Sequence, residues 1–419
     1  MCCGCCTQIG LCIAFLELLY TNLFVLKIRA ISPVMNAKTQ ITILNTIYDS
    51  SNAVRYHLGA FPPPPVDLER LLNPLIEATT ALTRYDTLLQ GLPNSELLLA
   101  PLRARDAVIS SRMEGTISTL EEVLRLEADA DATDQSDAAR NVALEVALYA
   151  RALRQAERQM ANGYPISAHL IRAAHRTLLS FGRGAKNRPG EFKIEQNYVG
   201  DRGQRRIDFI PVSPSQLAPA FEALISYIGN ADVQPLLKTA IAHAEFEALH
   251  PFDDGNGRLG RMLITLMLWE NRILSQPHFF VSDYFERHKD EYTAGLRDVS
   301  ASGNWTGWCL FFLTALASQA DANIDIVGKI QTHYEEMRER FREVLRSRWS
   351  VDALNYMFEN PIFRNNRFTR DAGIPKLTAN NFTKKLVDAE ILSVLIPPAG
   401  RAPGLYGFPS LLDIVREPD

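Results

Sequence analysis

Cysteine is scarce in the body of this sequence. Of the 6 cysteines in the 419-residue chain, all but Cys309 lie at or before Cys12. This distribution excludes a disulfide-stapled scaffold for the body of the protein. It favours a reducing compartment, and we expect a cytoplasmic protein that folds around an ordinary hydrophobic core.

An excess of charge of one sign is also missing. The 44 Lys and Arg residues nearly balance the 48 Asp and Glu residues, which gives a formal net charge of −4. This balance excludes the strongly basic surface typical of a protein whose whole length binds nucleic acid. Hydrophobic residues make up 47% of the chain, an ordinary globular share, and the length suggests about two or three domains.

Two common catalytic motifs are absent. No Gly-Lys-Ser or Gly-Lys-Thr follows a glycine-rich loop, which excludes a Walker A site. The His-Glu-x-x-His order of zinc hydrolases is missing as well, although His243, Glu247 and His250 share one predicted helix face. A simple helix pair between His243 and Glu247 is the preferred interpretation.

An apolar run near the N-terminus has several interpretations. Ile9 to Leu26 is mostly apolar, and Lys27 and Arg29 follow it. No basic region precedes the run, so it does not match a secretory signal peptide. Residues 1–34 are interpreted as upstream sequence before a true start at Met35, as a membrane anchor with its basic flank inside, or as a soluble appendage.

The stretch around which the chain is organised is His-Pro-Phe-Asp-Asp-Gly-Asn-Gly-Arg-Leu-Gly-Arg, residues 250–261. Residues 237–249 contain no Gly or Pro and are predicted to form a helix. Residues 259–269 are again apolar and helical. The stretch is therefore a loop between two helices, and its Gly-Asn-Gly part opens the second one.

Such a loop is suited to bind phosphate. Unpaired N–H groups at a helix start carry positive potential, and Gly255 and Gly257 let an anion approach them. Arg258 and Arg261 lie about one helical turn apart, so both guanidinium groups can reach the same anion.

Two more side chains of the stretch supply chemistry. Asp254 offers the hard oxygen that Mg²⁺ prefers when it bridges a carboxylate and substrate phosphates. His250 is the side chain here whose ordinary pKa lies near neutrality. A polyphosphate, Mg²⁺ and a histidine base together indicate phosphoryl or nucleotidyl transfer to a hydroxyl. The alternative is a solvated loop with a helix-end histidine, but it does not explain why these positions converge.

The stretch resembles the signature of the Fic/DOC family, His-x-Phe-x-Asp/Glu-Gly-Asn-Gly-Arg-x-x-Arg, at every fixed position. The resemblance covers about residues 36–320. It implies a mainly α fold, a Fic helical core with a small β-hairpin flap. It also implies an enzyme that moves AMP from ATP to a Ser, Thr or Tyr hydroxyl of a protein, itself included. The implied roles are catalytic base for His250, Mg²⁺ ligand for Asp254, and ATP contacts for Gly255, Asn256, Gly257, Arg258, Arg261 and His288.

A second family motif lies within residues 97–126, which are predicted to form one helix. Ser110, Glu114 and Gly115 match Ser/Thr-x-x-x-Glu-Gly/Asn, which marks an inhibitory helix in the family. The resemblance implies that Glu114 also reaches the ATP site, pairs with Arg261 and prevents productive seating of the γ-phosphate. The carboxylate would compete with phosphate for the same guanidinium donors. A glutamate on an exposed helix face is the alternative, and AMP removal assisted by Glu114 is a further open activity.

The flap and two sites around it follow from the same resemblance. Residues 191–212 contain short β-like stretches around Gly200–Gly203, similar to the flap hairpin that aligns a target segment by backbone pairing. His288 stands where the family often has an Asn near the nucleotide base. Tyr284 and Tyr292 either line that pocket or pack in the core.

The pattern divides the chain into five parts. Residues 1–34 form the leader, residues 36–130 a helical region with the inhibitory helix, and residues 138–320 the catalytic core. Residues 323–349 are predicted as a charged linker helix. Residues 350–419 are predicted as a winged-helix-like domain, with candidate phosphate contacts at Lys376, Lys384, Lys385 and Arg401.

The C-terminal domain leaves the choice of partner open. A winged helix either binds DNA or serves as a docking or homodimer module. The alternative to an adenylyltransferase is therefore a nucleotide-sensing transcriptional regulator. A structural protein with an inactive core is a third interpretation, which the intact His250 disfavours.

Overall fold

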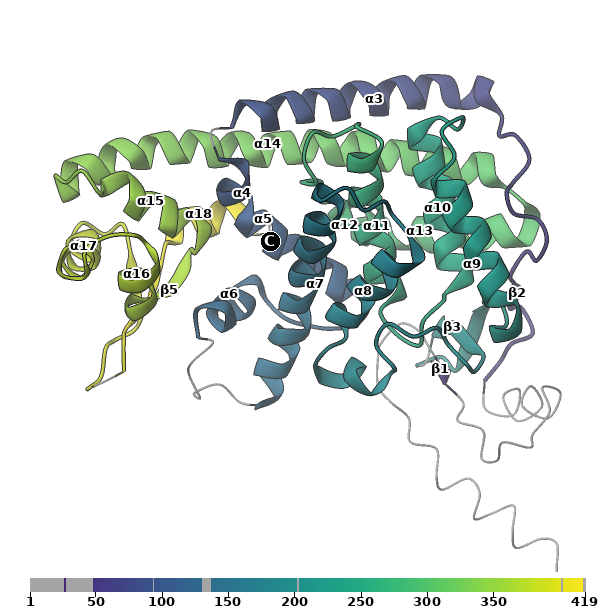
Figure 1. Ribbon diagram of the computed structural model, residues 1–419, viewed down its shortest axis with the longest axis horizontal. Helices are drawn as coiled ribbons and strands as arrows, with labels where there is room; N and C mark the ends of the chain where they lie inside the picture. Colours follow the sequence, from purple (N-terminus) through teal and green to yellow (C-terminus); the bar gives the residue numbers. More distant parts are fainter. Residues whose placement is uncertain are drawn as a thin grey trace, which may run out of the picture.

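The computed structural model describes residues 26–27, 48–92, 94–129, 137–201, 203–400 and 402–416. The molecule is an elongated, mainly helical body with the C-terminal elements at one end (Figure 1). The predicted mainly α fold is confirmed. The predictions for Met35 and for most of residues 1–34 lie outside the described residues.

Two long helices lie along one side of the molecule. Helix α3 (Leu68–Gly91) runs beside α14 (Trp305–Leu345) over much of its length (Figure 1). The predicted boundary between a core helix and a linker helix at residues 316–323 is wrong, because α14 is one helix of 41 residues. An apolar stripe continues through it and is buried at Val327, Ile330 and Phe341.

Among the described residues, α14 is the one helix whose length and composition would allow it to cross a membrane. The central helix of a globular core has the same properties, and α14 packs on α3, α10 and α15.

The core surrounds α10 (Pro235–Leu249), which is buried on all sides. Helix α10 packs against α9 (Pro214–Ile228), α11 (Asn256–Glu270) and α14. The other core elements are α7 (Asp137–Ala161), α8 (Ala168–Leu178), a short 3₁₀ helix (Gly182–Lys186), α12 (Ser282–Arg287) and α13 (Lys289–Ser302).

The predicted helix over residues 97–126 is three helices. They are α4 (Ser95–Leu98), α5 (Ala100–Met113) and α6 (Leu120–Ala128). The break falls at the inhibitory motif, because Gly115 has a φ of +80°, a left-handed conformation that suits glycine. Helix α6 then starts at Thr119, which exchanges hydrogen bonds with Glu122 in a capping box.

The predicted flap hairpin is present. Strands β3 (Asn197–Asp201) and β4 (Arg206–Ile210) pair antiparallel, and residue 202 lies outside the described residues. Short strands cover both edges of the hairpin. Strand β1 (Leu26–Lys27) pairs with β3, and β2 (Val54–Arg55) pairs in parallel with β4.

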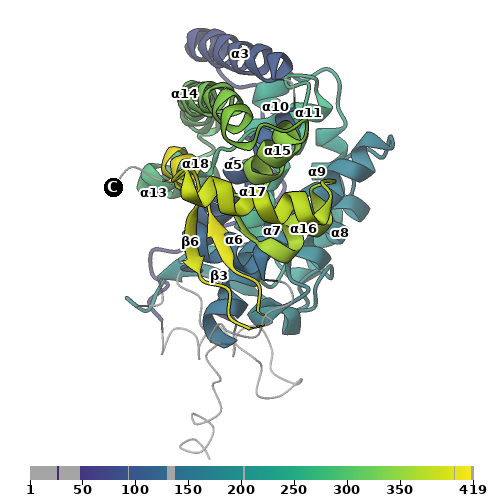
Figure 2. The ribbon, with the colours of Figure 1, turned by 90° about the vertical axis from the view of Figure 1, so that its left-hand side faces the viewer.

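The C-terminal unit comprises residues 350–416. It contains α15 (Ser350–Glu359), β5 (Ile362–Arg364), α16 (Asn365–Asp371), α17 (Lys376–Asp388), β6 (Ser393–Ile396), β7 (Leu405–Gly407) and α18 (Pro409–Val415). Its antiparallel sheet has the order β5-β7-β6, with α17 lying across it (Figure 2). The predicted contact Arg401 lies outside the described residues.

Candidate active site

His250 lies at the wall of a cavity of about 410 Å³ between α10, the flap and α13. It caps the end of α10 in a left-handed conformation, with a φ of 46°. Its Nδ1 lies 3.3 Å from the carbonyl oxygen of Glu247, which can only accept a hydrogen bond. Nε2 is therefore the acceptor nitrogen, and it is enclosed without a partner among the described residues.

The charge state of His250 suits a base. Burial, together with the nearby Lys193 ammonium, lowers the pKa of His250 to about 3. The ring is therefore neutral near pH 7, with a lone pair available on Nε2. An alcohol placed at Nε2 finds a proton acceptor there.

The loop after His250 is held by its own amides. The side chain of Asn256 accepts from the N–H of Phe252 and donates to its carbonyl oxygen, both at 2.8 Å. Both polar atoms of that side chain thus help to close the loop. An ATP contact of Asn256, which is the first residue of α11, stays a prediction.

Asn197 at the start of β3 and Lys193 just before the flap also fix this loop. Asn197 donates to the carbonyl oxygens of His250 and Phe252, each at 3.0 Å. Lys193 donates to Asn197 Oδ1 at 2.7 Å and to the carbonyl oxygen of Leu249 at 3.0 Å. These two positioning residues escaped sequence reasoning, because no spacing in the sequence links them to the loop.

His175 is a third such residue. Its ring stacks on Phe252 with centroids 3.8 Å apart, and its Nδ1 accepts from the N–H of Gly190 at 2.8 Å. Nε2 then donates to the carbonyl oxygen of Asp254 at 2.9 Å. Burial lowers the pKa of His175 to about 4, so the neutral ring holds the loop near neutral pH.

The start of α11 forms an anion site. Gly255 precedes the helix with a φ of +76°, and no side chain caps the first N–H groups. Arg258 is buried, and its Nε and Nη1 have no hydrogen-bond partner among the described residues. An enclosed guanidinium with free donors is costly unless an anion completes it, so this arrangement favours a bound phosphate.

Asp254 lies beside the anion site. Its Oδ1 accepts from the N–H of Gly255 at 2.6 Å and lies 3.5 Å from Nη2 of Arg258. Its side chain is 20% exposed, so an ion can reach it. The described residues hold no cluster of three or more metal-ligating side chains. A lone carboxylate beside a phosphate site nevertheless fits Mg²⁺, which takes its other ligands from phosphates and water.

The guanidinium of Arg261 donates hydrogen bonds to two residues of the Ser110–Gly115 motif. Its Nε donates to Ser110 Oγ at 2.9 Å, and Nη2 donates to the carbonyl oxygen of Ser110 at 2.7 Å and to Glu114 Oε1 at 3.0 Å. A Cβ added at Gly257 would lie only 2.1 Å from the same Glu114 oxygen. The carboxylate thus rests on the glycine face of α11, beside the anion site.

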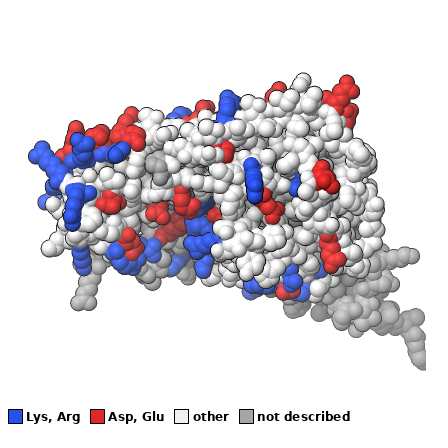
Figure 3. Space-filling view, turned by 45° about the horizontal axis from the view of Figure 1, so that its top comes forward, with Lys and Arg blue, Asp and Glu red and all other residues white. Residues whose placement is uncertain are grey.

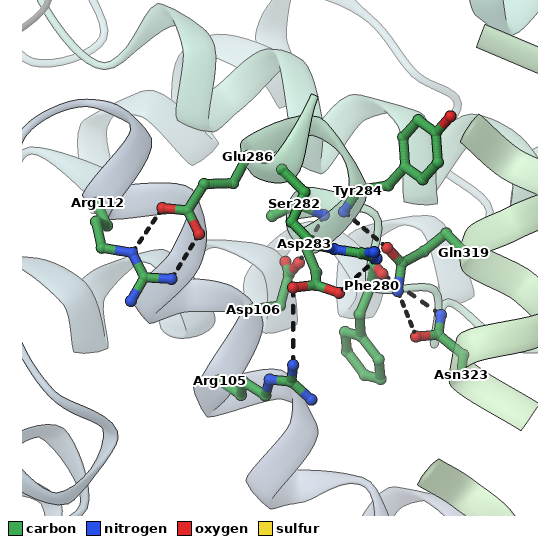
Figure 4. Close-up of polar contacts among 11 residues, drawn as sticks. Arg105, Asp106, Arg112, Phe280, Ser282, Asp283, Tyr284, Glu286, Gln319 and Asn323 are labelled. Atoms are coloured by element: carbon green, nitrogen blue, oxygen red, sulfur yellow. Dashed lines mark hydrogen bonds and ion pairs between the residues drawn. The ribbon is translucent and has the colours of Figure 1, made fainter. Parts of the chain in front are cut away.

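The helix that carries Glu114 is fastened to α12 (Figure 4). Arg112 donates to both carboxylate oxygens of Glu286, at 2.6 and 2.5 Å. Asp106 accepts from the N–H of Ser282 at 3.1 Å. These contacts hold α5 in the position that brings Glu114 to Arg261.

The expected helix pair between His243 and Glu247 is not formed. His243 Nδ1 lies 3.1 Å from the carbonyl oxygen of Gly260, and Nε2 lies 2.9 Å from the hydroxyl of Tyr292. Both ring nitrogens are therefore engaged, which argues against a zinc site. Tyr292 packs in the core.

Glu247 instead forms part of the cavity wall. Its Oε1 is enclosed without a partner among the described residues. Burial raises the pKa of Glu247 to about 8, with Arg261 opposing and Glu114 adding to the shift.

His288 lies between α12 and α13. Its ring stacks on Tyr284 with centroids 4.2 Å apart, and about a third of its side chain is exposed. The structure thus brings His250, Asp254, Gly255, Gly257, Arg258, Arg261 and Glu114 around one loop and helix start. A contact between His288 and a nucleotide base stays a prediction.

Fold and site together define a helical protein with a buried, neutral histidine beside a helix start that offers N–H and guanidinium donors. Residues 72–158 match the sequence profile described as Fic/DOC family N-terminal, and residues 165–268 match the one described as Fic/DOC family. The chain therefore contains two regions that match the Fic/DOC family.

Two curated proteins with sequences similar to this chain are named as protein adenylyltransferases. A probable protein adenylyltransferase of Aquifex aeolicus (strain VF5) is 31% identical over 92 residues, which are 22% of this chain and 26% of that protein. Protein adenylyltransferase fic-1 of Caenorhabditis elegans is 31% identical over 106 residues, 25% of this chain and 19% of that protein. The chain therefore spans about a quarter or less of the length of these curated relatives.

A solved structure shares the fold. The crystal structure of a Fic family protein from Desulfovibrio desulfuricans G20 superposes with a TM-score of 0.53 at 19% identity. The match covers 83% of this chain and 98% of that one. At this identity the likeness concerns the fold alone.

Proposed function

We propose that this protein transfers AMP from ATP to a hydroxyl side chain of a protein. The observation that carries the proposal is the enclosed, unpartnered Nε2 of His250 beside an anion site with free Arg258 donors. The names of the relatives, which are protein adenylyltransferases, support it. The hydroxyl belongs to a Ser, Thr or Tyr residue of a target or of the chain itself.

In this reaction His250 acts on the attacking alcohol. Its Nε2 takes the hydroxyl proton while the oxygen bonds to the α-phosphorus and the bond to the β-phosphate oxygen breaks, releasing pyrophosphate. Loop N–H groups and Arg258 bind the phosphates. Asp254 would hold Mg²⁺, which when bound neutralises charge on the phosphates. Positioning and charge stabilisation supply most of the rate enhancement in such transfers.

Glu114 is proposed to keep the resting protein inactive. Its carboxylate accepts a hydrogen bond from Nη2 of Arg261 and fills the space over Gly257. A γ-phosphate that needs the same donor is turned away, so the α-phosphate is misplaced for in-line attack. Whether the same carboxylate also promotes AMP removal calls for a separate assay with purified modified protein.

The proposed activity is tested with the position of the label. The Glu114→Gly variant is incubated with ATP labelled in either the α- or the γ-phosphate, with and without EDTA. Transfer of AMP predicts label on protein from α-labelled ATP only, and loss of transfer when Mg²⁺ is removed. Labelling from the γ-phosphate, or none from the α-phosphate, contradicts the proposal.

A regulator that binds DNA through the C-terminal unit is the second candidate. The order of its elements supports a winged helix, and α17 exposes Lys376, Asn380 and Lys384, with Leu377 exposed at 86%. Basic side chains at this end of the molecule are interspersed with acidic ones (Figure 3). DNA binding would appear as an affinity that falls steeply with salt and is weakened by Lys376→Ala or Lys384→Ala.

The same exposed face also suits a homodimer contact. A dependence of sedimentation on protein concentration that Leu377→Ala removes would support it. A cytoplasmic location is proposed because Cys309, the cysteine of the described chain, is a free and buried thiol.

A further inference from the structure

The C-terminal unit packs on both helices that meet at Glu114. Helix α5 ends at Met113, directly before Glu114, and α6 starts at Leu120. One apolar cluster joins α5, α6 and the C-terminal sheet and last helix. It comprises Ala104, Leu124, Ala128, Ile362, Leu405 and Leu412.

A buried ion pair reinforces this interface. Arg364 of β5 binds both carboxylate oxygens of Asp129, the residue directly after α6, with Nη2 3.1 Å from Oδ2. Both side chains are at most 10% exposed. Arg364 also donates from Nη1 to the carbonyl oxygen of Pro403 at 2.8 Å. One guanidinium thus ties α6 to the loop between β6 and β7.

Two exposed contacts extend the same interface along α6. Arg367 of α16 donates to the carbonyl oxygen of Glu127, and Arg416 after α18 pairs with Glu121. Helix α6 is therefore held near both of its ends.

The link from α6 to Glu114 is short and ordered. The N–H of Thr116 donates to the carbonyl oxygen of Ser111 at 3.0 Å, and Ser118 Oγ donates to Glu122 at 3.0 Å. A shift of α6 is thus carried into the turn at Gly115, because no long loop separates the two helices.

We propose that the C-terminal unit stabilises the inhibited state through the Asp129–Arg364 pair, so that breaking this pair activates transfer. The proposal rests on the proposed function, since it names a control of the same site. Breaking one partner of a buried pair leaves an uncompensated charge, so the interface loosens rather than adjusts. Couplings between distant sites typically change a measured affinity about 5- to 150-fold.

The test compares AMP transfer by wild type, Asp129→Asn, Arg364→Gln and the exchange Asp129→Arg/Arg364→Asp. Each single variant should raise transfer by about 5-fold or more, and the exchange should bring it back toward wild type. In the Glu114→Gly background, Asp129→Asn should have no further effect. The control is Glu335→Gln, which breaks an exposed pair with Arg338 on α14 and should leave transfer unchanged.

Hydrogen exchange gives a readout that needs no activity. Amides of residues 108–118 should exchange faster in Asp129→Asn than in wild type, while those of α10 should not change. The inference is overturned if exchange and transfer both match wild type in a folded Asp129→Asn protein. It is also overturned if Asp129→Asn raises transfer equally with and without Glu114. Absence of transfer in Glu114→Gly overturns the proposed function instead, and the exchange result then decides the inference alone.

Discussion

Gly257 lies directly beneath the carboxylate of Glu114, and a Cβ at position 257 would stand 2.1 Å from its Oε1. The two residues come from elements far apart in the sequence. The glycine gives room to whichever anionic group uses Arg261, whether carboxylate or phosphate. The proposed inhibitory contact therefore depends on the space over Gly257 as well as on the ion pair between Glu114 and Arg261.

Gly257→Ala should consequently displace Glu114, because the far end of a flexible side chain moves more easily than a helix backbone. Removing the Glu114 carboxylate should then raise AMP transfer by less than it does in the wild-type background. We expect the rise in transfer caused by Glu114→Gly to shrink from about 10²-fold to a few-fold in the Gly257→Ala background. Transfer rates of the four combinations measure this, and an undiminished rise would show that the two residues do not compete for space.

Arg112 provides a second, milder way to weaken inhibition. Its two-pronged pair with Glu286 holds α5 against α12, and both side chains are partly exposed (Figure 4). Losing it should destabilise the closed position of α5 by about 1 kcal/mol, so Arg112→Ala should raise transfer by about 5-fold. Arg338→Gln, which breaks an exposed pair on α14, is the control. Equal transfer rates for Arg112→Ala and wild type would exclude this role.

Glu247 should make stability depend on pH. Burial raises its pKa from 4.5 to about 8, so between these values the folded protein retains a proton that the unfolded chain has lost. Stability contributed by this group therefore falls as pH rises, by less than about 1.4 kcal/mol per pH unit. In urea unfolding, the free energy of unfolding of Glu247→Gln should rise relative to that of wild type from about pH 5 to about pH 8. A constant difference would mean that Glu247 ionises at its ordinary pKa.

The sequence predicted the loop and its two helices well, because the stretch from His250 to Arg261 is local and its glycines mark the helix start. The helix break at Glu114 and Gly115 was missed. The helical pattern continues on both sides of Gly115, which takes up a left-handed conformation in the structure. Helix α14 was divided in two for the opposite reason. Its second half looks charged, yet its apolar stripe is covered by α3 and the C-terminal unit.

The residues that position the loop could not be predicted from the sequence alone. Lys193, Asn197 and His175 act through backbone carbonyl oxygens of residues 249–254. Such contacts depend on where the chain passes in space, and any polar residue could make them. The ATP contact that the family motif implies for Asn256 stays a prediction, and the structure adds that its side chain closes the loop on Phe252.

The rate of AMP transfer tests most directly whether the protein is an adenylyltransferase that Glu114 holds inactive and that uses His250 as its base. AMP transfer from α-labelled ATP to protein is compared for wild type, Glu114→Gly and Glu114→Gly/His250→Ala at saturating ATP and Mg²⁺. Glu114→Gly should exceed wild type by about 10²-fold. The double variant should fall below Glu114→Gly by about 10²- to 10⁴-fold while still binding ATP, since only the base is lost. Equal transfer by Glu114→Gly and the double variant would contradict the claim.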